Sequence, residues 1–221
     1  MLSKTAILFD LDGTLVDTLT DLATATNNVL KKHELPIHPT EAFRQFVGNG
    51  AMMQIKRALG DHDASSLTET IYREYLEEYQ ARCLETVHPY EGIVEMLNTL
   101  QTLGATVGIV TNKPDPQAKA IAAHLFPNYP FCAVCGVTDE TPKKPDPTVA
   151  LQVLNKCGIA VERAAFVGDS DVDVHTAKNI GCIGIGVSWG FRGPQELLDA
   201  NTQFLANTPQ EVVDILCETF K

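Results

Sequence analysis

The sequence lacks the features that mark membrane proteins and nucleic-acid-binding proteins. Its 221 residues contain no run of the roughly 18–20 apolar residues that a membrane span needs. The N-terminal apolar run ends at Asp10, which is too early for a signal peptide. The chain has 17 lysines and arginines against 28 aspartates and glutamates, whereas binding to a nucleic-acid backbone needs a cationic surface. We therefore expect neither a membrane nor a nucleic acid as a partner.

Signs of a disulfide framework and of a nucleotide-binding loop are also missing. The six cysteines lie in otherwise ordinary globular sequence, and the CxxC pair Cys132 and Cys135 has no second pair. We expect reduced thiols that serve in packing, and a cytoplasmic location. No GxxxxGK[ST] loop occurs, and no GxGxxG follows a predicted strand.

What the sequence does contain is an alternation of apolar runs with amphipathic segments from residue 91 onward. This alternation is typical of an α/β fold with a doubly wound parallel sheet, a Rossmann-like core. Predicted strands cover residues 5–9, 106–110, 131–137, 163–167 and 183–187, and predicted helices cover 91–103, 116–125, 147–156, 171–180 and a last segment that opens at Thr208 and Pro209.

Residues 19–86 break this alternation, because they show only helical periodicity. The predicted helices there cover 22–32, 40–47, 51–59 and 67–84. We therefore expect an inserted α-helical cap at 19–87. The α/β core would then consist of residues 1–18 and 88–221, with His88 and Pro89 as the return hinge.

The segment after the first strand is the most informative one. Asp10 and Asp12 are spaced by two, so both side chains can point into one site. Gly13 permits a sharp turn and Thr14 adds a hydroxyl. Two carboxylates in one site suit a hard cation such as Mg²⁺, or a division of roles between nucleophile and acid/base. The alternative interpretation is a polar turn at the end of a strand.

Other polar residues follow the later strands. Because ligands of open α/β sheets bind at the carboxyl ends of the strands, these residues should meet at one edge. Together they supply the acids, the hydroxyl, the amide and the lysine that phosphoryl transfer uses. In such a site Mg²⁺ and the lysine would offset the clustered negative charges. Taken singly, Thr111-Asn112 also fits a turn, Lys144 a surface charge, and Asp171 or Asp173 a helix cap. The residues are Thr111, Asn112 and Lys113, then Lys143 and Lys144, then Asp169, Asp171 and Asp173.

Together these motifs resemble the haloacid dehalogenase superfamily. They read Asp-x-Asp-Gly-Thr from Asp10, Thr-Asn from Thr111, Lys-Pro-x-Pro from Lys144 and Gly-Asp-Ser-x-x-Asp from Gly168. The resemblance covers nearly the whole chain, including the helical insert. Within the superfamily the chain looks most similar to phosphoglycolate phosphatases, because of the segments Phe46-Val-Gly-Asn-Gly-Ala51, Val110-Thr-Asn-Lys-Pro114 and Gly186-Val-Ser-Trp-Gly190.

The resemblance implies roles for the motif residues. Asp10 would attack phosphorus, and Asp12 would act as acid and base while its carbonyl helps to bind the metal. Asp169 would be a direct Mg²⁺ ligand, with Asp173 near the metal through water. Thr111 and Lys144 would bind the phosphoryl oxygens; the Lys-Pro-Asp-Pro frame favours Lys144 over Lys143. Gly13, Thr14 and Asn112 would assist in that binding.

Substrate choice is expected to lie in the cap. Gly48, Asn49 and Gly50 precede a helix that starts near Ala51, and such a terminus can offer bare amides to a substrate carboxylate. The alternative is an ordinary interhelical turn. Lys56 and Arg57 lie on the same helix, and the sequence leaves open which of them faces the site. For His88 and His175 we expect surface or structural roles.

These observations predict a Mg²⁺-dependent phosphomonoesterase acting on a small phosphorylated metabolite through an aspartyl-phosphate, with phosphoglycolate as the first choice. Alternatives are a phosphatase for another small ester or pyrophosphate, and a phosphosugar mutase. A protein of a different class, a non-catalytic phosphate-binding regulatory module, would lack phosphate release. We expect a monomer or a small homo-oligomer.

Overall fold

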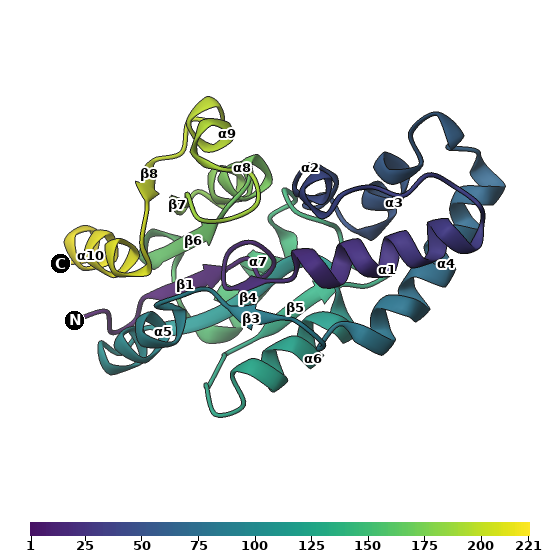
Figure 1. Cartoon of the computed structure of the whole chain (residues 1–221). Helices are drawn as coiled ribbons and strands as arrows, with labels where there is room; N and C mark the ends of the chain where they lie inside the picture. Colours follow the sequence, from purple (N-terminus) through teal and green to yellow (C-terminus); the bar gives the residue numbers. More distant parts are fainter.

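A computed structural model describes residues 1–221, and its centre is a six-stranded sheet in the order β5-β4-β1-β6-β7-β8 (Figure 1). Every neighbouring pair is parallel, so the predicted doubly wound α/β fold is confirmed. The strands are β1 (Ala6–Phe9), β4 (Thr106–Pro114), β5 (Val134–Val137), β6 (Ala164–Gly168), β7 (Ile183–Val187) and β8 (Phe204–Ala206).

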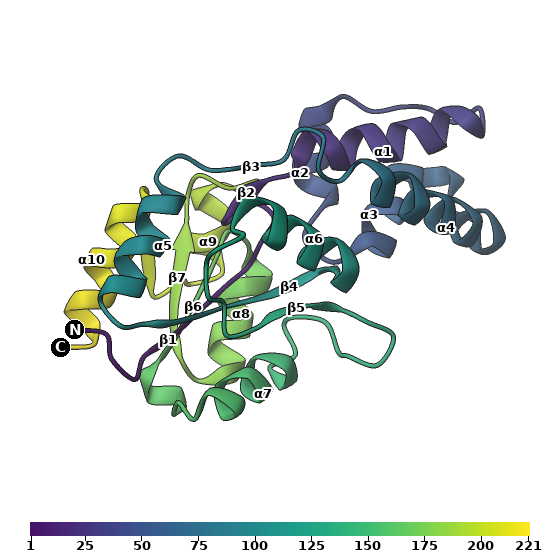
Figure 2. The ribbon, with the colours of Figure 1, turned by 90° about the horizontal axis from the view of Figure 1, so that it is seen from below.

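Helices cover both faces of the sheet (Figures 1 and 2). Because side chains alternate along a strand, Ile7 and Phe9 of β1 join a core cluster with α5, α6 and α10, whereas Ala6 and Leu8 join a second cluster with α7 and α8. All four residues of β1 are buried, as expected for a strand covered on both faces. The helices are α5 (Ile93–Thr102), α6 (Asp115–Leu125), α7 (Thr148–Cys157), α8 (Asp171–Ile180), α9 (Pro194–Asp199) and α10 (Pro209–Thr219), with the short η3 (Val161–Arg163) before β6.

The helices between β1 and α5 lie beyond the carboxyl ends of the strands (Figure 1). We call α1 to α4 the cap helices. The predicted helix over 40–47 is instead a 3₁₀ turn followed by a short α-helix. The elements are α1 (Leu19–Lys32), η1 (Thr40–Ala42), α2 (Phe43–Phe46), α3 (Ala51–Leu59), η2 (Gly60–His62) and α4 (Ser65–Arg82).

The chain leaves and re-enters the α/β region through two short strands that the sequence analysis did not identify. In β2 (Val16–Asp17) and β3 (His88–Pro89), Val16 lies opposite Pro89 and Asp17 opposite His88 in antiparallel register. The expected hinge residues are therefore one strand of this pair. The division into a core at 1–18 and 88–221 and a cap at 19–87 stays a prediction.

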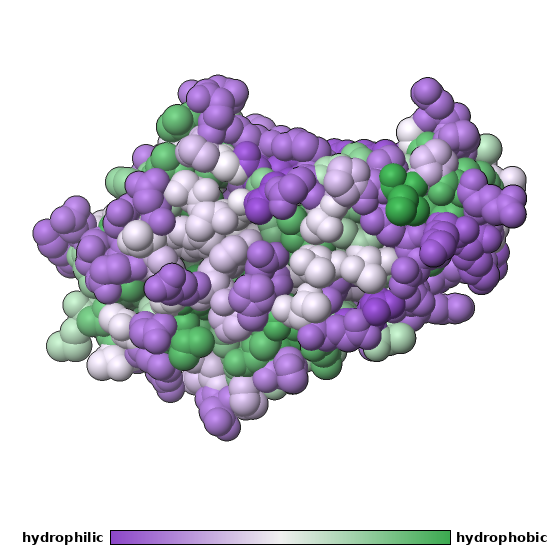
Figure 3. Space-filling model, viewed as in Figure 1, coloured by the Kyte–Doolittle hydropathy of each residue, from purple (hydrophilic) through white to green (hydrophobic).

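The remaining expectations concern the surface and the thiols. No helix combines the length and the apolar character needed to cross a membrane. All six cysteines are unpaired. Hydrophilic side chains predominate on the face shown in Figure 3, and apolar ones are scattered among them.

Candidate active site

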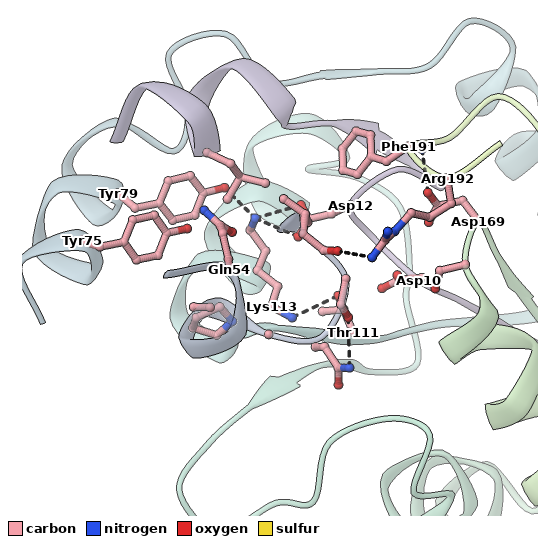
Figure 4. A pocket seen from close by; sticks show the side chains of 18 residues that line it. Asp10, Asp12, Gln54, Tyr75, Tyr79, Thr111, Lys113, Asp169, Phe191 and Arg192 are labelled. Carbon is pink, nitrogen blue, oxygen red and sulfur yellow. Dashed lines mark hydrogen bonds and ion pairs between the residues drawn. The ribbon is translucent and has the colours of Figure 1, made fainter. Parts of the chain in front are cut away.

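The carboxyl ends of β1, β4 and β6 and the cap helices enclose one cavity of about 40 Å³ (Figure 4). Residues from both sides line it, so the expected meeting of the strand ends with the helical insert is present. The core contributes Asp10, Asp12, Thr111, Asn112, Lys113 and Asp169, and the cap region contributes Gly48, Gly50, Ala51, Gln54, Tyr75 and Tyr79.

Asp10 follows β1 directly and is held from three sides. Its N–H donates to the Val167 carbonyl at 2.9 Å, and the Leu11 N–H donates to Asp10 Oδ1 at 2.7 Å. The Lys144 ammonium lies 2.9 Å from the same Oδ1 and 2.7 Å from Asp173 Oδ1. These contacts fix the carboxylate at the floor of the cavity and bring the first and third motifs together.

Lys144 is a buried cation and not the surface charge of the alternative interpretation. Its side chain is only 3% exposed, whereas Lys143 is exposed. Burial lowers the pKa of Lys144, but the Asp10 and Asp173 carboxylates outweigh that effect, so the net shift is upward. The ammonium therefore stays charged. Of the two candidate lysines, only Lys144 contacts the motif carboxylates.

Asp169 lies close to Asp10 and Asp173 in the site. The Phe191 N–H donates to its Oδ2 at 2.7 Å, and the Thr14 hydroxyl donates to its Oδ1 at 3.4 Å. Carboxylate oxygens of Asp10, Asp169 and Asp173 all lie within 4.8 Å of one another, and all three residues are buried. Burial and then the charges of Asp173 and Asp10 raise the pKa of Asp169 well above its usual range.

This acidic triad fits a divalent cation. Three buried carboxylates provide the hard oxygen ligands that Mg²⁺ and similar cations prefer, and their mutual repulsion is relieved by a bound positive charge. The Asp12 carboxylate lies outside this triad.

Asp173 has a second function in the fold. The Ser170 N–H and hydroxyl donate to Asp173 Oδ2 at 3.1 and 2.7 Å, which caps the first turn of α8. Its Oδ1 meanwhile accepts from Lys144. Asp173 therefore caps α8 and also contacts Lys144 of the site, while its expected place near a metal stays a prediction. Asp171 makes no side-chain contact with the triad.

Gly13 is required where it stands. Its φ is +81°, and a Cβ atom there would collide with the Asp169 carboxylate. Its N–H donates to the Val16 carbonyl at 2.9 Å, and the Thr14 N–H donates to the Leu11 carbonyl at 3.3 Å. Contrary to expectation, these two amides are occupied inside the turn. The Asp12 amide is the one in this turn that has no acceptor within the protein.

Asn112 connects three segments through its side chain. Its Nδ2 donates to the Gly48 carbonyl at 3.3 Å and to the Lys144 carbonyl at 3.1 Å, while its Oδ1 accepts from the Lys144 N–H at 2.8 Å. The amide side chain is therefore committed to protein contacts. Thr111 is buried beside it and lines the cavity with its hydroxyl, which accepts from the Lys113 N–H at 3.3 Å.

The loop before α3 presents peptide amides to the cavity. Gly50 is the N-cap, with φ +87°, and the first helical hydrogen bonds come from Met53 and Gln54 to the Gly50 carbonyl at 3.1 and 3.2 Å. The N–H groups from Gly48 to Met52 have no acceptor within the protein. Because Gly48, Gly50 and Ala51 line the cavity, this helix N-terminus can receive an anion.

Arg57 holds this loop in place through hydrogen bonds. It donates to the Phe46 carbonyl at 2.9 Å and to Asn49 Oδ1 at 2.6 Å, while Lys56 is exposed. Arg57 thus supports the loop and does not line the cavity. Asn49, expected with Gly48 and Gly50 to offer its amide to a substrate, does not line the cavity itself; its side chain accepts from Arg57, and its N–H has no acceptor within the protein. His88 and His175 are exposed, as expected.

Two basic residues of the site were not predicted. Arg192 follows Phe191 and donates to the Val47 carbonyl at 2.9 Å, which ties the core to the cap loop. Lys113 was noted in its motif but given no role, and its Nζ lies 2.8 and 3.0 Å from the two Asp12 oxygens. Figure 4 shows its amino group between Asp12 and Tyr79. Neither contact has a local sequence signal, since each joins residues far apart in the chain.

Comparison with known proteins gives consistent matches over nearly the whole chain. Residues 7–187 match the sequence model of the family described as haloacid dehalogenase-like hydrolase. A phosphoglycolate phosphatase of Pseudomonas savastanoi pv. phaseolicola is 32% identical over 94% of this chain and 78% of its own length. An N-acetylmuramic acid 6-phosphate phosphatase of Pseudomonas aeruginosa is also 32% identical, over 96% of this chain and 94% of its own.

A solved structure shares the fold. The haloacid dehalogenase-like family hydrolase from Streptococcus pneumoniae superimposes with a TM-score of 0.87 at 27% identity, covering 97% of this chain and 99% of that one.

Proposed function

The chain belongs to the haloacid dehalogenase-like hydrolase family and is a phosphatase, and from this premise we propose that it hydrolyses a small phosphomonoester through a phosphorylated Asp10 with the help of Mg²⁺. The observation that carries the proposal is that Asp10, Asp12 and Asp169 line one cavity, with Lys144 paired to the Asp10 carboxylate. A carboxylate nucleophile, an acid/base and compensating positive charge are the groups that in-line phosphoryl transfer needs.

In the first step Asp10 attacks phosphorus and forms the acyl-phosphate bond, while the ester P–O bond breaks. Asp12, two residues further on, gives its proton to the departing alkoxide oxygen. In the second step Asp12 takes a proton from water, the water oxygen bonds to phosphorus, and the acyl-phosphate bond breaks. Inorganic phosphate leaves and both carboxyl groups are restored.

The remaining side chains would balance the charge of the substrate and hold the reacting groups in position. Lys144 keeps Asp10 in place and would offset the negative charge of the incoming phosphoryl group, with the Thr111 hydroxyl and the Asp12 amide as hydrogen-bond donors to its oxygens. Asp10, Asp169 and the Asp12 carbonyl would hold Mg²⁺, with Asp173 beside it through water. When bound, the metal supplies the positive charge that allows an anionic nucleophile to approach an anionic ester.

The substrate we propose is phosphoglycolate. It carries a carboxylate close to its phosphate, and residues with free amides at the start of α3 line the same cavity as Asp10. The cavity of about 40 Å³ matches a small ester. On a scale of about 10–15 Å³ per water molecule, that volume holds only a few waters. A bulkier sugar phosphate would require the cap helices to stand further from the sheet.

A second candidate is N-acetylmuramic acid 6-phosphate, because a relative of equal identity carries that name. The two candidates differ greatly in size, so one assay separates them. Phosphate release should be measured with Mg²⁺ for phosphoglycolate, N-acetylmuramic acid 6-phosphate, pyrophosphate, a hexose phosphate and an aryl phosphate, with Asp10→Asn as the blank. We expect the highest kcat/KM for phosphoglycolate. A higher value for the muramic acid ester would reject this substrate assignment.

A further inference from the structure

We propose that Lys113 is a positioning residue for Asp12, and that Tyr79 of the cap makes this positioning depend on a closed cap. The inference rests on the proposed acid/base role of Asp12. It starts from a buried cluster in which the Lys113 ammonium contacts both carboxylate oxygens of Asp12 and the hydroxyl of Tyr79.

Lys113 is deeply buried although it carries a charge. Its side chain is 1% exposed, and it belongs to β4 at the point where the register with β5 shifts between Val110 and Pro114. A buried ammonium is costly unless its N–H groups are paired. Its three observed acceptors match the three hydrogens that an ammonium can donate. This complete pairing fixes the Lys113 side chain in one arrangement.

The same cluster fixes Asp12. The Thr18 hydroxyl donates to Asp12 Oδ1 at 2.8 Å, and Lys113 contacts both oxygens at 2.8 and 3.0 Å. Without Lys113 the carboxyl group would keep only the Thr18 bond and would be free to rotate. An acid/base has to be within hydrogen-bond reach of the leaving oxygen, and a misplacement of about 1 Å can cost on the order of 100-fold in rate. Lys113 supplies the second fixed point.

Tyr79 brings the cap into this arrangement. It lies on α4, is fully buried, and stacks on Tyr75 with ring centroids 5.6 Å apart. Its hydroxyl has Lys113 as its only partner within the protein. Asp12 and Lys113 belong to the core, so movement of α4 away from the sheet would remove one of the three acceptors of Lys113. The carboxyl group is therefore fully aligned only when the cap covers the cavity.

Another role for Lys113 would be direct binding of the substrate carboxylate, since Lys113 lines the same cavity. The observed contacts favour Asp12, because both of its oxygens already occupy the ammonium. The two roles differ in kinetics. A positioning residue affects kcat for every ester, whereas a carboxylate ligand affects KM only for substrates that carry a carboxylate.

The test compares Lys113→Met, Asp12→Asn and the double variant on phosphoglycolate, on an alkyl phosphate that lacks a carboxylate and on p-nitrophenyl phosphate. For the alkyl ester, Lys113→Met should lower kcat about 10–100-fold while KM changes little. With p-nitrophenyl phosphate the leaving group needs no proton, so both single variants should release one equivalent of nitrophenolate rapidly and then turn over slowly. The double variant should be no slower than Asp12→Asn within about threefold, because Lys113 acts through Asp12.

Three results would overturn the inference. These are multiplicative losses in the double variant, the absence of a burst in Lys113→Met, and a KM effect confined to phosphoglycolate. Wild-type turnover of the alkyl ester by Asp12→Asn would instead reject the acid/base role itself, so the two failures are distinguishable. Lys156→Met, on the exposed end of α7, serves as the control for losing a lysine and should behave as wild type.

Tyr79→Phe tests the link to the cap and does not depend on the folding of Lys113→Met. It removes one hydroxyl from the cluster and should lower kcat for the alkyl ester about tenfold, the effect of one hydrogen bond to a charged group. The loss should vanish in the Asp12→Asn background. An unchanged kcat in Tyr79→Phe would show that Asp12 is aligned without the cap.

Discussion

Gly13 and Asp169 lie so close together that the site has no room for a Cβ atom between them. The two residues come from the ends of neighbouring strands, β1 and β6, and are separated by more than half of the chain. The turn that carries Asp12 therefore packs directly against a carboxylate of the acidic triad. A substitution at either position should therefore weaken metal binding.

Gly13→Ala should displace the Asp169 carboxylate and raise the Mg²⁺ concentration needed for half-maximal activity. The matched control is Gly158→Ala, because Gly158 also has a positive φ, +66°, but has no atom within 4 Å of the added Cβ. Both variants should lose on the order of 1 kcal/mol from backbone strain. Only Gly13→Ala should change the Mg²⁺ titration; equal titrations would contradict the packing argument.

Asp169→Ala should remove activity or raise the Mg²⁺ requirement sharply, since it deletes one of three converging carboxylates. The matched control is Asp171→Ala, at the first residue of α8 two positions later. Activity as a function of Mg²⁺ is the measurement, with chelation as the zero point. A normal titration for Asp169→Ala would place the metal elsewhere.

Lys144→Met should abolish turnover and also destabilise the fold. It leaves the buried Asp10 and Asp173 carboxylates without their shared cation, and breaking a buried ion pair costs about 3–5 kcal/mol. Lys143→Met, one residue earlier but exposed, should keep both the stability and the turnover of an aryl phosphate. Denaturant unfolding and kcat measured on both variants check the assignment. Similar losses in the two variants would show that the ion pairs of Lys144 with Asp10 and Asp173 are not responsible for the effect.

Ala51→Pro should weaken the use of phosphoglycolate more than the use of an aryl phosphate. Proline is tolerated at the first position of a helix, so the change deletes one free amide facing the cavity and leaves α3 intact. We expect kcat/KM for phosphoglycolate to fall about tenfold, the loss of one hydrogen bond to a charged group. Equal losses on both substrates would mean that the loop supports cap closure and does not bind the carboxylate.

That the motif residues would meet could be predicted from the sequence, because their meeting depends on a general rule. Residues at the carboxyl ends of neighbouring parallel strands must meet, and this brought Asp10, Thr111 and Asp169 together without knowledge of side-chain contacts. Helix limits were also clear where a glycine marks them, as at Gly50 before α3 and Gly181 after α8.

Other features had no local signal. Strand β8 has three residues at the edge of the sheet and follows a polar loop, so it is too short to show a pattern. Burial of Lys113 depends on Asp12 and on Tyr79, which approach only in the folded chain. Arg192 likewise acquires its partner Val47 through the packing of the cap loop. Long-range pairing of single polar residues leaves no periodicity in a sequence.

The most direct test of the whole account is to trap the phosphoryl group on Asp10. The Asp12→Asn variant should form the intermediate from p-nitrophenyl phosphate but hydrolyse it slowly, so acid quenching in the first turnover should preserve it. Mass spectrometry of the peptides should find one phosphoryl group on Asp10, removable by hydroxylamine and absent from Asp10→Asn. A phosphoryl group on another residue, or none during measurable turnover, would contradict the proposed mechanism.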